Sequence, residues 1–357
     1  KGHKFSSETD TESVAHLLSD LRKAHKGDLT AAMRDAVKAL RGSFTLLAIH
    51  ADAPDVIVGV RRNSPLVVGL GDGENFMASD VAAFIEFTKK AIELGQDEVV
   101  TMTPTSVEIT DLDGNPVKPK QYEISWDASA AQKGGFAHFM LKEIFEQPKA
   151  VADTLIGRLS DNNQIVLDEL HMSAEEIRSL KKITVIACGT AYHAGMVAKY
   201  AIEKWAKIPV DVEIASEFRY RDPIIDPSTL IIAISQSGET MDTLMAVRHA
   251  KAAGGRVLAI CNTNSSTIPR ESDAVLYTHA GPEIAVASTK ALLTQIIAVY
   301  LIGLHLGQVN GSLKDSDVRD LYKELLELPG KIEQILETVE PLRELTRTFA
   351  QNNTVLF

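Results

Sequence analysis

Cysteine is scarce in this chain. Only Cys188 and Cys261 occur among the 357 residues, and each ends an apolar run. Two cysteines cannot build a disulfide-rich scaffold, and neither has the spacing of a zinc ligand set. The ten histidines form no metal-ligand pattern either. The sequence therefore predicts no metal and no cofactor, and we interpret both cysteines as small buried side chains of a cytoplasmic protein.

An excess of positive charge is also missing. The chain has 37 basic and 48 acidic residues, mixed along its whole length, and a formal net charge of -11. A protein that binds nucleic acid needs a basic surface to neutralise the phosphates, and no basic stripe is present. We therefore expect no nucleic-acid partner.

A hydrophobic run of membrane-spanning length is absent as well. The longest apolar stretch, Ala291–Gly307, includes Thr294 and Gln295 and is shorter than the roughly 20 residues that a bilayer requires. We expect a helix in the core or at a subunit interface. The first residues show no signal-peptide pattern, so the sequence predicts no membrane partner.

The first third of the chain predicts an α+β fold, and the total length predicts at least two domains. Residues Thr11–Ala24 carry apolar side chains at helical spacing. Short strands separated by turn residues follow, which indicates antiparallel pairing. We expect these strands at Phe44–Ile49, Asp55–Val60, Leu66–Leu70, Val99–Met102, Ser106–Thr110 and Gln121–Ile124.

The remainder of the chain predicts a different architecture. Residues 127–135 have the composition of a linker, and a helix is expected within His138–Gly157. From Lys182 onward, continuous apolar runs alternate with helical segments, which is typical of an α/β fold with a doubly wound parallel sheet. Such sheets bind ligands at the carboxyl ends of their strands. The expected strands are Ile183–Cys188, Leu230–Ser235 and Val257–Cys261, with Val212–Ile214 and Ala274–Tyr277 as further candidates.

The loop Ser235–Thr240 is the strongest candidate site. It lies between an expected strand and an expected helix, whose first backbone N–H groups can bind a phosphate. Its serine and threonine hydroxyls add donors, and Gly238 allows the backbone to approach closely. The lysine of a Walker motif is absent, so hydrolysis of a nucleoside triphosphate is not indicated. A well-capped helix with incidental hydroxyls is the alternative interpretation.

Two further turns offer hydroxyl groups at the same edge of the sheet. Thr190 follows the first expected strand, and Ser288 precedes the long apolar helix. Each could be an ordinary turn or cap, but three such turns on one sheet are less easily explained as three separate caps. Beside them, His193 is a candidate proton shuttle or a structural side chain. The charged residues of Glu217–Asp222 suit an interface, an ion-pair network or a solvated surface.

Read together, these motifs resemble the sugar isomerase (SIS) domain, and the chain resembles in particular the family of glutamine:fructose-6-phosphate amidotransferases. Four ordered motifs carry the resemblance, namely Ala187–Thr190, Ser216–Arg221, Ser235–Thr240 and Val286–Lys290. Further matches extend it over nearly the whole chain, namely Ser7–Glu12, Ser64–Val67, Ala78–Asp80, Gly134–Gly135, His138–Ile144 and Glu146–Pro148.

The resemblance implies a reaction and a set of binding residues. The family couples a glutaminase domain of the N-terminal-nucleophile type to two SIS domains, and converts fructose 6-phosphate and glutamine to glucosamine 6-phosphate and glutamate. Asp10 would bind the amino group of glutamine, where a helix N-cap would otherwise be preferred. The family often has serine in place of Ala191, so only a backbone contact is implied there. The residues implied to hold the phosphate are Ser235, Gln236, Ser237 and Thr240, and those implied to contact the sugar are Thr190, Ala191, Val286 and Ser288.

The resemblance also implies which parts of the family's machinery this chain lacks. The nucleophilic cysteine would precede Lys1, and the catalytic residues of the sugar site would follow Phe357. We therefore expect a fragment with no catalytic residue of its own. It would hold the end of a glutaminase domain at 1–126, a linker and connecting helices at 127–180, the first SIS domain at 181–310, and further helices with the start of a second SIS domain at 311–357. The oligomeric state usual in this family implies that the protein is a homodimer.

Two other functions remain open at this stage. A SIS-family phosphosugar isomerase or deglycase would explain the three loops, but not the Ser7–Glu12 motif or the strands that follow it. A non-catalytic phosphosugar-sensing protein would be expected to carry a basic helix-turn-helix segment, and the sequence shows no such pattern.

Overall fold

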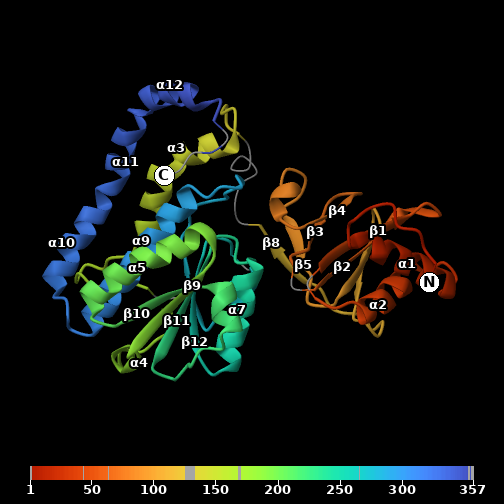
Figure 1. The fold of residues 1–357 in the computed structure, drawn as a ribbon, viewed down its shortest axis with the longest axis horizontal. Helices are drawn as coiled ribbons and strands as arrows, with labels where there is room; N and C mark the ends of the chain where they lie inside the picture. Colours follow the sequence, from red (N-terminus) through yellow and green to blue (C-terminus); the bar gives the residue numbers. More distant parts are fainter. Residues whose placement is uncertain are drawn as a thin grey trace. The chain divides into compact units, whose positions relative to one another are not determined.

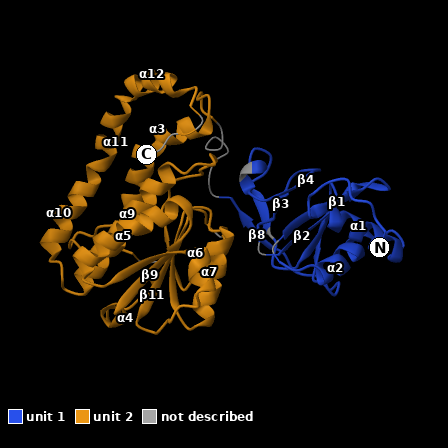
Figure 2. Ribbon diagram, viewed as in Figure 1, with its two compact units in different colours: residues 1–132 blue, residues 133–357 orange. Residues whose placement is uncertain are grey.

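The computed structural model describes residues 2–42, 44–62, 64–124, 133–167, 170–264, 266–352 and 354. The chain forms two compact units, residues 1–132 and 133–357, each with its own sheets and core (Figure 2). Most of the predicted linker at 127–135 lies outside the described residues, as does the apolar end Val355–Phe357.

The first unit stacks two helices and two antiparallel sheets (Figure 1). The strand order is β1-β2-β6-β7 in one sheet and β4-β3-β5-β8 in the other. Helices α1 and α2 bury Leu18 and Met33 against Val58 of the first sheet, and the two sheets meet through side chains such as Val68 and Val100. The elements are α1 Thr11–Ala24, α2 Leu29–Ala39, β1 Phe44–His50, β2 Ala53–Arg62, β3 Val67–Leu70, β4 Asn75–Ala78, the short 3-10 helix Val81–Ala83, β5 Lys90–Glu93, β6 Val99–Met102, β7 Val107–Thr110 and β8 Lys120–Glu123.

The α+β prediction for this unit is confirmed, with the predicted helix and the six predicted strands found within two residues of their expected bounds. Helix α2 and strands β4 and β5 are present in the structure but were not predicted from the sequence. Strands β4 and β5 are as short as the predicted β3, but β4 has no β-branched residue and β5 begins and ends with a charged residue, so neither shows an apolar β-branched run like that of β3. Helix α2 does carry a signal, because the carboxylate of Asp28 caps it by accepting a hydrogen bond from the Ala31 N–H at 2.9 Å.

The second unit is built on a five-stranded sheet in which every pairing is parallel, in the order β10-β9-β11-β12-β13. Helices α5 and α9 cover one face, and α6, α7 and α8 cover the other (Figure 1). The predicted doubly wound parallel sheet is therefore confirmed. The elements are α3 Phe139–Leu155, α4 Ala174–Ser179, β9 Lys182–Ala187, α5 Gly189–Ala206, β10 Val210–Ile214, α6 Ala215–Tyr220, β11 Thr229–Ser235, α7 Met241–Ala252, β12 Arg256–Cys261, α8 Thr267–Glu271, β13 Ala274–Tyr277, α9 Lys290–Val309, α10 Asp315–Leu326, α11 Leu328–Leu336 and α12 Val339–Phe349.

Helix α9 contains the long apolar stretch of the sequence. The expectation that this run is too short for a bilayer is wrong, because α9 has 20 residues and is long and apolar enough to cross a membrane by length and composition alone. Most of that apolar window is buried inside the unit, where α9 packs against α5, α3 and the sheet. The prediction of a core helix is confirmed.

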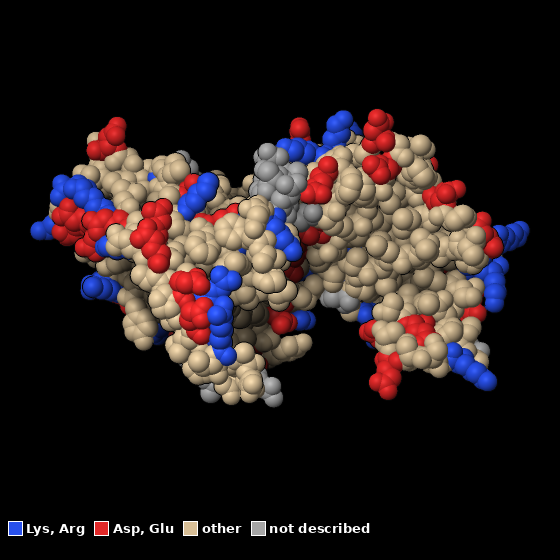
Figure 3. All heavy atoms as spheres, turned by 90° about the horizontal axis from the view of Figure 1, so that it is seen from above, with Lys and Arg blue, Asp and Glu red and all other residues tan. Residues whose placement is uncertain are grey.

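Charged side chains of both signs are interspersed on the face of the molecule that Figure 3 shows. Wide areas of uncharged residues separate them. This distribution agrees with the mixed charge pattern of the sequence.

Candidate functional site

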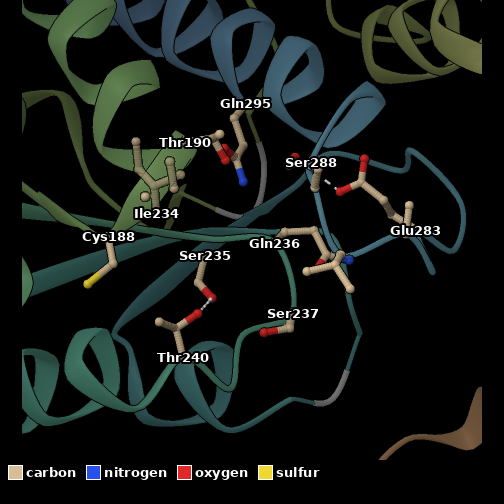
Figure 4. Close-up of a pocket in the computed structure, with 15 residues that line it drawn as sticks. Cys188, Thr190, Ile234, Ser235, Gln236, Ser237, Thr240, Glu283, Ser288 and Gln295 are labelled. Atoms are coloured by element: carbon tan, nitrogen blue, oxygen red, sulfur yellow. Dashed lines mark hydrogen bonds between the residues drawn. The ribbon is translucent and has the colours of Figure 1, made fainter. Parts of the chain in front are cut away.

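A pocket of about 360 Å³ opens at the carboxyl edge of the parallel sheet (Figure 4). Three segments far apart in the sequence form its walls: the turn from β9 into α5, the loop after β11, and the loop before α9. Every residue expected to contact a sugar phosphate lines this pocket, namely Thr190, Ala191, Ser235, Gln236, Ser237, Thr240, Val286 and Ser288.

The loop after β11 folds around the hydroxyl of Ser235. That oxygen accepts the N–H of Gly238 at 3.0 Å and shares a hydrogen bond of 3.0 Å with the hydroxyl of Thr240. The hydroxyl of Ser237 accepts the N–H of Glu239 at 3.2 Å, which leaves its own hydrogen for another acceptor. Ser235 is only 2% exposed, and through these two bonds its hydroxyl shapes the loop.

Neighbouring elements fix the position of this loop. The carbonyl of Gln236 accepts the N–H of Asn262 at 3.0 Å, and that of Gly238 accepts the N–H of Ile268 at 2.9 Å. Gly238 has a φ of 67°, and a Cβ placed there would lie 1.9 Å from the Ser266 hydroxyl oxygen. Only glycine fits this position, because a side chain would meet both backbone strain and a steric clash.

Two glutamates organise the loop before α9. Glu283 caps the helix, because its carboxylate accepts the N–H groups of Thr289 at 2.9 Å and Ala291 at 3.0 Å. The same carboxylate accepts the hydroxyl of Ser288 at 3.1 Å (Figure 4). Glu143, on α3, accepts the N–H groups of Ile284 at 2.6 Å and Ala285 at 3.1 Å. The loop is thus held by carboxylates on both sides of its pocket-facing part.

The described lining of the pocket contains no lysine or arginine, and Glu283 is its one charged residue. The nearby Lys290 is 3% exposed and pairs with Glu146 at 2.6 Å. Any anion bound here would therefore be held by hydroxyls, backbone N–H groups and the positive end of α7, which begins directly after Thr240.

Several residues that line the pocket were not predicted from the sequence, chief among them Glu283 and Gln295. Glu283 lies in a segment without periodic pattern, and Gln295 is a polar residue within an apolar helix. Asn or Gln inside a long apolar helix is a signal that could have drawn attention to it, because burying an unpaired amide is costly. Cys188 also lines the pocket, whereas Cys261 is fully buried and desolvation raises the pKa of its thiol.

Other candidates of the sequence analysis lie elsewhere. The exposed His193 is absent from the pocket lining and stacks edge-on against Tyr192. The charged segment 217–222 belongs to α6 and its end, where Arg221 pairs with Glu213 and Arg219 lies over the ring of Tyr220. Within the described residues, no group of three or more His, Cys, Asp or Glu side chains could hold a metal ion.

Asp10 lies in the first unit, directly before α1. It is exposed, and its carboxylate makes no capping hydrogen bond to the helix. Glu12 holds the preceding segment at Ser6 and Ser7. Its carboxylate accepts hydrogen bonds from the hydroxyl and the N–H of both serines. These bonds, the Ser7 hydroxyl first, lower the pKa of Glu12 to about 2. The Asp10 carbonyl accepts hydrogen bonds from the hydroxyl and N–H of Ser13, and its exposed carboxylate accepts one from the Thr11 hydroxyl at 3.4 Å.

Comparison with known proteins shows what this chain is similar to. A model of the SIS domain matches residues 176–304. The chain is 60% identical over all 357 residues to the glutamine–fructose-6-phosphate aminotransferase (isomerizing) of Streptomyces coelicolor, and 56% identical over its whole length to that of Corynebacterium efficiens. It spans 58% of the length of each of these relatives.

A solved structure extends the comparison to three dimensions. The C-terminal domain of glucosamine-fructose-6-phosphate aminotransferase from Francisella tularensis is 41% identical, with a TM-score of 0.59. The match covers 62% of this chain and 62% of that one. The chain is therefore homologous over its whole length to the glutamine–fructose-6-phosphate aminotransferases, and its second unit carries a SIS domain.

Proposed function

We propose that this chain serves the glutamine-dependent conversion of fructose 6-phosphate to glucosamine 6-phosphate, and that its pocket holds the sugar phosphate. The observation that carries the proposal is the convergence of eight residues, expected from three separate loops, on one pocket. The homologues named for this reaction match the chain through both units. The alternative of a single-domain phosphosugar isomerase would not account for the first unit.

The phosphate would bind in the loop 235–240. The Ser237 hydroxyl has a hydrogen to donate, Thr240 lines the pocket with its hydroxyl 3.0 Å from that of Ser235, and α7 begins directly after Thr240. Gly238 keeps the backbone of the loop in the shape that brings these donors together. Anchoring the phosphate fixes where the reacting carbons of the sugar lie, which is the contribution to catalysis that this loop can make.

The sugar would lie between the other two walls. Thr190 is exposed at the start of α5, and Ser288 faces the pocket from the loop before α9. Ala191 is 8% exposed and has no hydroxyl, so its backbone would make the contact. Val286 directs its fully exposed side chain to solvent, so its contact would also come from the backbone.

We further propose that the first unit belongs to a glutaminase domain of the N-terminal-nucleophile type, with Asp10 as the partner of the glutamine amino group. The stacked helices and sheets and the uncapped Asp10 carboxylate support this assignment. We assign no catalytic residue to the chain itself. A cytoplasmic homodimer is part of the same proposal.

Calorimetry with fructose 6-phosphate tests the sugar-phosphate site. The double variant Ser237→Ala with Thr240→Ala should bind at least tenfold more weakly, because each charge-assisted hydrogen bond contributes about 1.5–3 kcal/mol. Ser179→Ala is the matched control, since that hydroxyl lies on α4 and donates to the carbonyl of Glu176 at 2.6 Å, outside the pocket. Unchanged affinity in the double variant would show that the phosphate binds elsewhere.

A further inference from the structure

Gln295 is a buried amide that no part of the described protein satisfies. It lies on α9, is 2% exposed, and lines the pocket. Its side-chain carbonyl oxygen is fully buried and has no hydrogen-bond partner among the described residues. Figure 4 shows the side chain extending from α9 toward Thr190 and the interior of the pocket.

The neighbouring residue on the same helix shows the usual arrangement. Thr294 is fully buried, and its hydroxyl donates to the carbonyl of Ala291 at 3.0 Å within α9. The polar group of Thr294 is thus satisfied without a ligand. A primary amide left unpaired at an equally buried position lowers stability, so its presence indicates a partner that binds from the pocket.

The surroundings identify which end of the ligand Gln295 would meet. Thr190 and Ser288, which we place against the sugar, lie beside it in the pocket, and the carboxylate of Glu283 caps the start of α9. A negative charge at that position disfavours a phosphate there. A neutral amide offers two donors and an acceptor, which suits hydroxyl and carbonyl groups, since these also donate or accept.

We propose that Gln295 binds the hydroxyl or carbonyl groups of the sugar and thereby distinguishes a phosphorylated polyhydroxy ligand from a phosphate alone. This inference rests on the proposed function of the pocket. It assigns to α9 a part in ligand selection, in addition to its place in the core.

The test compares two ligands on variants of the same protein. Gln295→Met has a similar volume and no amide, and its affinity for fructose 6-phosphate should fall about tenfold, the effect of one lost hydrogen bond. Its affinity for inorganic phosphate, measured by calorimetry, should not change. Its melting temperature should stay equal or rise, because an unpaired buried amide has been removed. Gln295→Leu repeats the measurement with a second apolar side chain.

Thr294→Val is the matched control, because it removes a buried polar group that already has its partner in α9. It should change the melting temperature and leave the preference between the two ligands as it was. Equal affinity of Gln295→Met and the unchanged protein for fructose 6-phosphate would overturn the inference while leaving the proposed function intact. If Gln295→Met had a lower melting temperature and lost affinity equally for both ligands, Gln295 would have a structural role, and the inference would be overturned as well. Absence of fructose 6-phosphate binding by the unchanged protein would instead refute the proposed function.

Discussion

Replacing Glu143 should destabilise the loop before α9. It should also weaken ligand binding in the pocket, although Glu143 does not line the pocket itself. The Glu143 side chain is 2% exposed, and one carboxylate oxygen accepts both the Ile284 and the Ala285 N–H groups. The other oxygen is buried without a hydrogen-bond partner among the described residues. The loop therefore depends on a carboxylate contributed by a helix more than a hundred residues earlier in the chain.

The size of the effect follows from these contacts. Glu143→Leu removes two charge-assisted hydrogen bonds worth about 1.5–3 kcal/mol each and leaves two backbone N–H groups without an acceptor. Part of this loss is offset because a buried charge is also removed. We expect the free energy of unfolding to fall by about 3 kcal/mol. Glu143→Gln keeps an acceptor oxygen in the same place and should lose about 1 kcal/mol.

Urea denaturation of the purified chain, followed by circular dichroism, measures both values. Lys149→Gln is the matched control on the same helix, because Lys149 makes an exposed pair with Asp153 and such pairs contribute about 0–1 kcal/mol. Calorimetry should also show weaker binding of fructose 6-phosphate by Glu143→Leu, since Ser288 lies in the same loop. A stability loss below about 0.5 kcal/mol in Glu143→Leu would refute the reasoning, because two satisfied buried hydrogen bonds cannot be that weak.

Two further predictions concern the phosphate loop and the first unit. Gly238→Ala should abolish measurable fructose 6-phosphate binding in calorimetry and lower the melting temperature, because the added Cβ would overlap the Ser266 side chain at a φ that favours glycine. Retained affinity would mean that the loop can rearrange. Asp10→Asn should weaken glutamine binding about tenfold in calorimetry by removing one charged partner, whereas the exposed Glu8→Gln should have no effect. Equal glutamine affinities for the two variants would exclude Asp10 from the glutamine site.

The phosphate loop could be predicted from the sequence because its signal is local. A buried strand, a short run of hydroxyl residues around Gly238 and the start of a helix are adjacent in the chain. Parallel pairing then places Thr190 and Ser235 at the same edge, since β9 and β11 are neighbours in the sheet. Six of the eight predicted residues, at 190–191 and 235–240, meet for that reason, whereas Val286 and Ser288 belong to the loop before α9 that Glu143 and Glu283 hold.

The residues that were not predicted either contact residues far away in the sequence or reach the pocket only because of how their helix is rotated about its axis. Glu143 bonds to amides 141 and 142 positions away, and no spacing rule connects α3 with that loop. Whether Gln295 faces the core or the pocket depends on how α9 is turned against α5 and the sheet. Helix α2 is a different case, because Asp28 and the spacing of Ala32, Met33, Ala36 and Val37 were visible in the sequence.

The absence of lysine and arginine from the described pocket lining has a consequence for the kinetics of binding. A site lined by cations attracts an anionic ligand through solution, and added salt slows its association by screening that attraction. Here the donors are neutral and act only at contact, while the chain carries a formal net charge of -11. If the pocket binds a sugar phosphate as proposed, the net charge would repel that ligand at long range, and screening by salt would speed its association. The uncharged donors and the start of α7 would then select the ligand at contact rather than steer it from solution.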